Sequence, residues 1–200
     1  MAVANRSEKQ NKSSRGRLRI VAGIWRSRVL EFADAPGLRP TSERIRETLF
    51  NWLAPRLAGA RCLDLYAGTG ALGMEALSRG AASAVFVERS PSAVAALQRN
   101  VDLLEASGAI VKATDARHYL QSPDAGAFDV VFLDPPFADD NLGELCRLIR
   151  EHGILADGAN VYLEQHRAQA VPELPDDWTV VKNKTAGNVR YLLVAVGHRN

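Results

Sequence analysis

The residues whose types most clearly suit a chemical role are Asp134-Pro135-Pro136-Phe137, which directly follow the apolar run 128–133. Such a run is typical of a strand that is buried on both faces of a sheet. The two prolines fix the backbone and remove two N–H donors, so the corner offers hydrogen-bond acceptors beside an aromatic ring. This corner suits an exocyclic amino group, which has two N–H bonds to satisfy, on a flat base. A strand-ending turn with a half-buried Phe is the alternative, and the four residues alone do not decide between them.

A glycine motif precedes this corner in the chain. Gly68, Gly70 and Gly73 form a GxGxxG pattern between a predicted strand, 61–66, and a predicted helix. This context is typical of a nucleotide-type cofactor that lies against a glycine turn and a helix N-terminus. Glu88 ends the next predicted strand, twenty positions after Gly68, where a carboxylate can accept hydrogen bonds from both ribose hydroxyls. The alternative for Glu88 is a solvated residue in front of the following helix.

Asp64 bears on which nucleotide-type cofactor the motif holds. A nicotinamide dinucleotide needs its pyrophosphate against the helix N-terminus, whereas S-adenosylmethionine has no phosphate and carries an amino group and a sulfonium. Asp64 lies four residues before Gly68, where its carboxylate would oppose a pyrophosphate. Its presence therefore favours S-adenosylmethionine. An acid that caps the amides of the turn is the alternative, and it is compatible with the same role.

Asp115 follows the third predicted strand, 109–113. It can accept from the adenine amino group of the cofactor, cap the predicted helix 116–121, or do both. In an open parallel sheet the ligand binds beyond the carboxyl ends of the strands, so residues that follow successive strands converge there. The residues predicted to meet at this edge are Asp64, Gly68, Gly70, Glu88, Asp115 and Asp134.

The net charge of +2 is unevenly distributed along the chain. Residues 1–56 contain twelve Lys and Arg against five Asp and Glu, a balance of +7, whereas the other 144 residues have a balance of −5. A basic front on an acidic body indicates a polyanionic partner such as nucleic acid, and a solvated charged tail is the alternative. We expect residues 1–16, which are polar and basic, to be a disordered tail that can act as an electrostatic arm on RNA.

Two short strands, Leu18–Ala22 and Arg28–Phe32, are predicted to form a ribbon joined around Gly23. Basic residues surround Trp25 in this ribbon, which fits a nucleic-acid surface where Arg contacts phosphate and Trp stacks on a base. The alternative for Trp25 is that it packs the ribbon onto the main domain. The basic residues are Arg17, Arg19, Arg26 and Arg28.

A helix is predicted to begin at Thr41 or Ser42 and to end at Pro55. One face of it is apolar and docks on the domain, whereas Arg44 and Arg46 lie off this stripe. The apolar stripe consists of Ile45, Leu49, Trp52 and Leu53.

The rest of the chain continues the alternation of strands and helices. Helices are predicted from Pro91, with Ser90 as the cap, and from near Asn141. Their predicted buried stripes are Val94, Leu97, Val101 and Leu104, and Leu142, Leu145, Cys146 and Ile149. A fifth strand is predicted at 161–164, and 178–182 and 190–196 are predicted to form a closing antiparallel pair.

Several classes of protein are disfavoured by composition. The chain has only two cysteines, Cys62 and Cys146, each in an apolar segment, which argues against a disulfide framework and for a reducing compartment. Its four histidines are scattered without ligand spacing, so we expect no metal. No apolar run approaches a membrane span, and residues 1–14 lack the apolar core of a signal peptide. We therefore expect a cytoplasmic protein.

These motifs resemble a known class of enzymes. The segments Asp64-Leu-Tyr-Ala-Gly-Thr-Gly70 and Asp134-Pro-Pro-Phe137, with Glu88 and Asp115, are similar to those of class I S-adenosylmethionine-dependent methyltransferases that modify exocyclic amines. The stretch Arg39-Pro-Thr-Ser-Glu-Arg-Ile-Arg-Glu-Thr-Leu-Phe-Asn-Trp-Leu53 narrows the resemblance, together with Gly-Ala-Arg-Cys-Leu before Asp64. It resembles the RsmD family, bacterial methyltransferases of one guanine N(2) in 16S ribosomal RNA.

The similarity to the RsmD family runs from about Arg17 to Val196, nearly the whole chain. One departure lies in the ribbon, where the family usually reads Gly-Gly-x-Trp-Arg-Gly and this chain reads Ala-Gly-Ile-Trp-Arg-Ser from Ala22 to Ser27. The departure concerns the turn of the ribbon and leaves the chemistry of the other motifs unchanged.

The resemblance implies an α/β, Rossmann-like class I fold. We expect a seven-stranded, mostly parallel sheet with an antiparallel last strand, plus a small N-terminal β-ribbon and helix. The expected parts are the tail 1–16, an RNA-binding extension 17–56 and a methyltransferase domain 57–200. The expected cofactor is S-adenosyl-L-methionine. We expect the protein to be a monomer whose partner is 16S rRNA within a small-subunit particle.

The resemblance also assigns residues to roles. The residues expected at the cofactor are Asp64, Ala67, Gly68, Gly70, Glu88, Asp115, Ala116 and Asp134, bordered by Arg39 and Thr41. The residues expected to contact RNA are Arg17, Arg19, Trp25, Arg26, Arg28, Pro136 and Phe137. The expected catalytic residues are Asp134, Pro135 and Phe137. In this hypothesis an extruded guanine stacks on Phe137, while Asp134 and the Pro135 carbonyl accept its two amino protons.

Three other functions compete with this hypothesis. A DNA adenine methyltransferase would use a similar proline corner, but the chain has no room for a sizeable target-recognition domain. A nicotinamide-dependent oxidoreductase would use the glycine turn but leaves the corner and the basic front unexplained. A non-catalytic RNA-binding assembly factor could keep the fold, and the presence of Asp134 and Glu88 argues against it.

Overall fold

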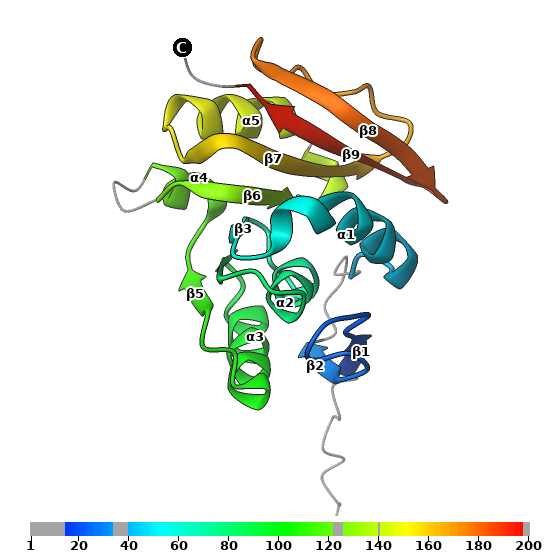
Figure 1. Ribbon diagram of the computed structural model, residues 1–200, viewed down its shortest axis with the longest axis vertical. Helices are drawn as coiled ribbons and strands as arrows, with labels where there is room; N and C mark the ends of the chain where they lie inside the picture. Colours follow the sequence, from blue (N-terminus) through cyan, green and yellow to red (C-terminus); the bar gives the residue numbers. More distant parts are fainter. Residues whose placement is uncertain (1–14, 34–39, 122–125, 140, 198–200) are drawn as a thin grey trace, which may run out of the picture.

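The computed structural model describes residues 15–33, 40–121, 126–139 and 141–197. A seven-stranded sheet with strand order β5-β4-β3-β6-β7-β9-β8 crosses the molecule (Figure 1). Strands β3 to β7 are parallel, and β9 is antiparallel to both of its neighbours, as the fold prediction required. The strands are β3 (Arg61–Asp64), β4 (Ser83–Glu88), β5 (Ala109–Ala113), β6 (Phe128–Leu133), β7 (Leu155–His166), β8 (Trp178–Ala186) and β9 (Val189–Val196).

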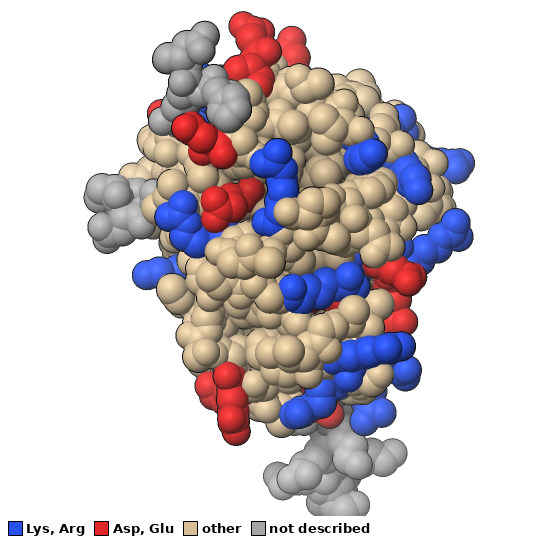
Figure 2. Space-filling model, viewed as in Figure 1, with Lys and Arg blue, Asp and Glu red and all other residues tan. Residues whose placement is uncertain are grey.

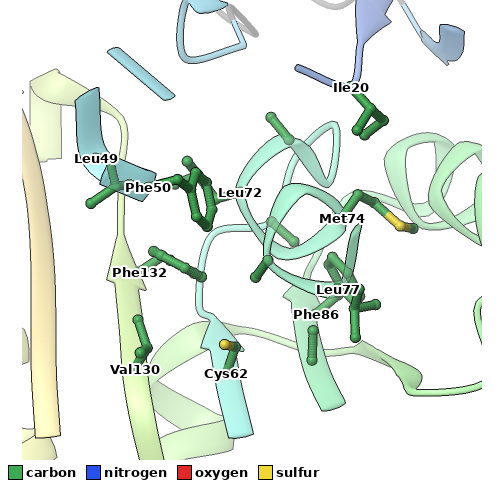
Figure 3. Close-up of a cluster of buried hydrophobic side chains, with 14 of the residues drawn as sticks. Ile20, Leu49, Phe50, Cys62, Leu72, Met74, Leu77, Phe86, Val130 and Phe132 are labelled. Atoms are coloured by element: carbon green, nitrogen blue, oxygen red, sulfur yellow. The ribbon is translucent and has the colours of Figure 1, made fainter. Parts of the chain in front are cut away.

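Helices cover both faces of the sheet because its strands are apolar on both sides. One apolar cluster packs α1, α2 and α3 against side chains such as Phe86 and Phe132 (Figure 3), and a second packs α4 and α5 against side chains such as Val131 and Leu163. The two helical layers lie on opposite sides of the sheet in Figure 1. The helices are α1 (Glu43–Leu57), α2 (Ala71–Ser78), α3 (Pro91–Leu104), α4 (Ala116–Leu120) and α5 (Leu142–Glu151).

The predicted ribbon exists, with β1 (Arg15–Arg19) paired antiparallel to β2 (Val29–Ala33), but its first strand begins and ends three residues earlier than predicted. The strand ends early because the backbone N–H groups of Val21 and Ala22 donate to the Glu75 carboxylate on α2, each at 2.9 Å, instead of continuing the ladder. Arg15 and Gly16 therefore belong to a strand and not to the predicted tail. Residues 1–14 lie outside the described residues.

The turn of the ribbon docks on the end of α2. The Ile24 N–H donates to the Ser78 carbonyl at 2.8 Å, and a Cβ at Gly23, whose φ is +86°, would stand 1.8 Å from that same carbonyl oxygen. Only glycine fits this contact. Ser27, at the position where the family usually has glycine, also adopts a left-handed conformation with a φ of 68°.

Helix α1 departs from its prediction in two respects. It begins as expected, with the Ser42 Oγ accepting from the Ile45 N–H at 3.4 Å, but it continues through Pro55 to Leu57. Because Pro55 lies in the last turn and the side chain of Leu57 is buried, the loss of one backbone bond does not end the helix there. The second difference is that Arg46, predicted off the buried stripe, is fully buried, whereas the predicted stripe residue Trp52 is only half-buried.

Arg46 is buried because every one of its nitrogens has a partner. Its Nη1 lies 3.1 Å from Glu75 Oε2, its Nη2 donates to the Arg19 carbonyl at 2.8 Å, and its Nε donates to the Thr41 carbonyl at 3.2 Å. The pattern of apolar spacing does not reveal this pair, since the acidic partner lies on another helix.

The later elements lie where they were predicted but differ in burial and in length. In α3, Val94 is half-buried, and Ala93 and Ala96 join the predicted stripe. Strand β7 is much longer than the predicted 161–164, since its first residues also pair with β6. None of the helices in the described ranges is long and apolar enough to cross a membrane.

We predict that Arg46→Ala lowers the free energy of unfolding by about 3–5 kcal/mol, because it opens a cavity and leaves Glu75 with one fewer cation in a buried setting. Urea denaturation monitored by circular dichroism measures this. Arg147→Ala is the matched control, since Arg147 pairs with Glu151 on an exposed helix face and its loss should cost less than about 1 kcal/mol. Equal losses in the two variants would contradict the structural role of Arg46.

Candidate functional site

A cleft of about 830 Å³ opens at the carboxyl ends of strands β3 to β7, where the sequence placed the site. The N-terminus of α1 borders it through Thr41, and the turn between β8 and β9 borders it through Asn188. The predicted site residues that line it are Thr41, Asp64, Ala67, Gly68, Glu88, Asp115, Ala116, Asp134, Pro135, Pro136 and Phe137. Arg39, also predicted, lies outside the described residues.

The glycine turn between β3 and α2 is shaped by its left-handed residues. Gly68 has a φ of +49°, and Gly70, with a φ of +76°, is the N-cap of α2. A Cβ at Gly70 would stand 2.4 Å from the Leu97 side chain, so this glycine permits close packing of α2 and α3. Gly70 is buried and, unlike Gly68, does not line the cleft.

Asp64 supplies the cap that Gly70 cannot. Its Oδ2 accepts from the Gly73 N–H at 3.0 Å, so the interpretation of Asp64 as an acid that binds the turn amides is confirmed. The carboxyl is almost completely buried, and burial raises its pKa from 3.8 to about 7 against the opposing effect of the Gly73 bond, with a further rise from Glu88. The cleft therefore contains an acid that titrates near neutral pH.

Glu88 joins the glycine turn to the start of α3. One carboxylate oxygen accepts from the Gly68 N–H at 2.9 Å, and the other accepts from the Ser90 N–H at 2.7 Å. Each carboxylate oxygen can accept more than one hydrogen bond, so both remain available to a ligand in the cleft. Glu88 is thus held in place by backbone amides and is not the freely solvated residue of the alternative interpretation.

Asp115 is the N-cap of α4, as one of its two interpretations required. Its Oδ1 accepts from the Arg117 N–H at 2.9 Å and more weakly from the His118 N–H at 3.4 Å. Its Oδ2 lies 4.0 Å from Arg89 Nη1, and about half of the side chain is exposed. The cap therefore leaves one oxygen open beside the cleft.

Asp134 and Glu164 form a second acidic group at the ends of β6 and β7. The Thr41 Oγ1 lies 3.3 Å from Asp134 Oδ2 and 3.2 Å from Glu164 Oε2, and the Tyr162 hydroxyl donates to Glu164 Oε2 at 2.7 Å. Burial, followed by the neighbouring Glu164, raises the pKa of Asp134 well above its ordinary value. Burial also raises the pKa of Glu164, while its bonds to Tyr162 and Thr41 lower it.

The residues after Asp134 turn outward as a short 3₁₀ helix, Phe137–Asp139. Pro135 is buried, whereas Pro136 and Phe137 are exposed, Phe137 by 37%. The Phe137 ring lies edge-on to the His166 ring, with 6.1 Å between centroids. An exposed aromatic ring at the mouth of a polar cleft is available for stacking.

Glu164 and its partner Tyr162 were not predicted as site residues. The signal was present, because Glu164 ends a predicted strand of the same parallel sheet as Asp64, Glu88 and Asp134. The Glu164 carboxylate has two hydroxyl partners: Tyr162 lies on the same strand, and Thr41 lies 123 residues away in the sequence. No local pattern indicates the contact with Thr41.

The basic residues of the ribbon lie on the surface. Arg17, Arg19, Arg26 and Arg28 are exposed, whereas Trp25 is half-buried and packs on the apolar cluster beneath α2, as its structural alternative predicted. Lys and Arg gather along the side of the molecule that carries the ribbon, α1 and β8 (Figure 2). Within the described ranges, no three His, Cys, Asp or Glu side chains are grouped to hold a metal ion.

Comparison with known proteins identifies relatives over nearly the whole chain. Residues 18–195 match the family described as conserved hypothetical protein 95. Ribosomal RNA small subunit methyltransferase D of Escherichia coli K12 is 44% identical over 186 residues, which are 93% of each chain. The protein of the same name from Haemophilus influenzae is 40% identical over 92% of this chain and 96% of its own.

Solved structures of other proteins have a similar fold. The structure of yhhF from Escherichia coli is 40% identical and has a TM-score of 0.85 over 92% of this chain and 100% of its own. A protein solved in complex with SAH has a TM-score of 0.69 at 14% identity, over 84% of this chain and 54% of its own, and this likeness concerns the fold alone. With the match over residues 18–195 and relatives above 30% identity, the chain belongs to the family of conserved hypothetical protein 95, the RsmD family that its motifs indicated.

Proposed function

We propose that the protein transfers the methyl group of S-adenosylmethionine to the exocyclic N(2) of one guanine in 16S rRNA of the small ribosomal subunit. The observation that carries this proposal is the corner at Asp134, where two acceptors stand beside an exposed ring in the same cleft as the glycine turn. The relatives named as small-subunit rRNA methyltransferases support the RNA substrate. The choice of guanine N(2) as the methylated atom rests on the resemblance to the RsmD family.

The residues of the cleft fit S-adenosylmethionine. When bound, this cofactor supplies an electrophilic methyl group on a sulfonium. Its positive groups suit a cleft with buried acids, and its adenosine presents N–H and O–H donors for which Glu88 and Asp115 retain free acceptors. We assign Glu88 to the ribose, Asp115 and Ala116 to the adenine, and Asp64 with Ala67 and Gly68 to the amino-acid end.

The same cleft disfavours a dinucleotide. A pyrophosphate binds at a helix N-terminus through free backbone amides and the helix dipole. At α2 the Gly73 N–H is already bonded to Asp64, whose carboxylate would repel a phosphate. This supports S-adenosylmethionine over a nicotinamide cofactor.

The chain promotes transfer by holding the target amine and taking its proton. The guanine amino nitrogen is a weak nucleophile because its lone pair is delocalised into the ring. Asp134 and the Pro135 carbonyl accept the two N–H bonds and so orient the nitrogen, while Phe137 stacks on the base. Asp134 then receives the released proton, and the raised pKa of this carboxyl suits that step.

RNA approaches over the basic side of the molecule. We assign the extension 17–56 to RNA binding, with Arg17, Arg19, Arg26 and Arg28 as phosphate contacts, and residues 57–200 to the transfer reaction. Trp25 is more buried than a stacking residue needs, so its role is to fix the ribbon. We propose that the protein acts as a monomer on small-subunit particles in the cytoplasm.

We predict that wild-type protein incubated with radiolabelled S-adenosylmethionine and small-subunit particles lacking the modification yields N(2)-methylguanosine at one position, identified by mass. Asp134→Ala should lower turnover by about 10²–10⁴-fold and leave cofactor affinity within a few-fold. The variant removes a hydrogen-bond acceptor of the target amino group, and the same carboxylate takes the released proton. Asp129→Ala, on the same strand but at its opposite end, is the matched control. Full turnover by Asp134→Ala would exclude this mechanism.

We predict that Asp64→Asn changes how stability of the cofactor-free protein depends on pH. The pKa of Asp64 is about 7 in the folded protein and 3.8 as an ordinary carboxyl, so between these values the folded state binds the extra proton and stability falls as pH rises. The variant should remove about 1.4 kcal/mol per pH unit of this slope between pH 4 and 7. Urea denaturation across this range measures it, with the exposed Asp102→Asn as control. An unchanged slope would refute the assignment.

We predict that Arg17→Ala combined with Arg26→Ala weakens binding to small-subunit particles without lowering turnover at saturation. Each lost phosphate contact should reduce the slope of log affinity against log salt by about one. Filter binding from 50 to 300 mM salt measures this, and Arg147→Ala on the opposite helical layer is the control. An unchanged salt slope would exclude the ribbon as the RNA-binding surface.

A further inference from the structure

Glu164 lies beside Asp134 and, like it, is held by a side-chain hydroxyl and by no backbone amide of the described residues. Its side chain is almost completely buried, and its Oε2 bonds with both Thr41 and Tyr162. Its Oε1 receives no hydrogen bond from any residue in the described ranges, although Glu164 lines the cleft. Glu164 is therefore a fixed carboxylate whose Oε1 can accept a hydrogen bond from a ligand in the cleft.

The target base has one donor more than the catalytic corner can satisfy. Guanine carries three N–H bonds along one edge, two on N(2) and one on N1, and an extruded base is read at this edge. In the proposed function, Asp134 and the Pro135 carbonyl accept the two bonds of N(2). The N1–H would then enter a buried site without a partner, which is unfavourable unless another acceptor is present.

We propose that Glu164 accepts the N1–H of the target guanine and thereby makes the cleft specific for guanine over adenine. The inference rests on the proposed function. The placement fits, because Asp134 Oδ2 and Glu164 Oε2 bond to the same Thr41 hydroxyl at 3.3 and 3.2 Å and therefore lie within 6.5 Å of each other. The two strands that carry these acids are neighbours in the sheet, so both carboxylates face one edge of a bound base.

Adenine is rejected by the same arrangement. Adenine has a lone pair at N1 where guanine has an N–H, so a carboxylate in this place would face another acceptor and both would remain unpaired. A site built to hydrogen-bond one group discriminates strongly against an analogue that lacks it. Glu164 is therefore a specificity-determining residue, whereas Thr41 and Tyr162 are positioning residues that fix its Oε2.

The test compares guanine with 2-aminopurine, which keeps the 2-amino group but has an unprotonated N1. The target nucleotide is first located with natural particles. 16S rRNA carrying either base there is then assembled by ligation around a synthetic segment and packed into particles. kcat/KM for methyl transfer is measured with wild type, Glu164→Gln and Glu151→Gln, an exposed Glu on α5. Melting temperature and cofactor affinity show that each variant is folded.

Wild type and Glu151→Gln should prefer guanine by at least about 100-fold. In Glu164→Gln this preference should fall tenfold or more, because an amide can donate to the N1 of 2-aminopurine. The change in the ratio is the decisive quantity, since 2-aminopurine also lacks the 6-oxo group. Tyr162→Phe keeps the acid but releases its Oε2, so it should lower the preference by a smaller factor, and it serves as the second variant should Glu164→Gln not fold.

The outcomes separate this inference from the proposed function. A preference that is unchanged in both Glu164→Gln and Tyr162→Phe would overturn the role of Glu164 and leave guanine methylation intact. A uniform loss of transfer to both bases would also overturn it, since this is the signature of a merely structural residue. Failure of the wild type to methylate natural particles would instead overturn the proposed function, and the inference with it.

Discussion

The buried pair of Arg46 and Glu75 holds the ribbon, α1 and α2 together, and the cleft depends on it. Glu75 accepts hydrogen bonds from Val21, Ala22, Arg46 and Arg79, and so anchors the chain that leaves β1 to the side of α2. Arg46 extends this anchor to the Thr41 carbonyl at the start of α1. Thr41 bonds in turn to both Asp134 and Glu164. The ribbon and these two acids are therefore connected through Glu75, Arg46 and Thr41. Removal of one partner of a buried pair is costly, so we expect the loss of either residue to disturb both the ribbon and the start of α1.

A second constraint is the gathering of acids at one edge of the sheet. Asp64, Asp134 and Glu164 all have raised pKa values, because burial disfavours their charged forms. A protein selected only for stability would not place them together. In the proposed function a cationic cofactor and a base rich in N–H donors offset this cost when they bind, so the edge suits these ligands at the expense of the stability of the free protein.

The fold and most of the cleft could be predicted from the sequence because both follow from local rules. Residues that come after parallel strands meet at one edge, and this rule alone brings Asp64, Glu88, Asp115 and Asp134 together. Buried polar partners from distant segments follow no such rule. Arg46 was predicted to lie off the buried stripe because apolar spacing ignores a charge whose partner is 29 residues away, and Glu164 was passed over because its partner Thr41 lies 123 residues away.

The two halves of the acidic edge differ in the groups that hold them. On the side of β3, β4 and β5, each acid accepts from backbone N–H groups, Asp64 from Gly73, Glu88 from Gly68 and Ser90, and Asp115 from Arg117 and His118. Backbone amides only donate, so they hold each carboxylate in place as an acceptor.

On the side of β6 and β7, Asp134 and Glu164 are held by the hydroxyls of Thr41 and Tyr162. A hydroxyl can donate or accept, and the single proton of Thr41 cannot serve both acids as donor at once. This side therefore tolerates a change in protonation without losing its geometry. An edge that is rigidly held in one half and adaptable in the other matches the proposed reaction, in which the cofactor half only binds and the half that meets the base accepts a proton in every turnover.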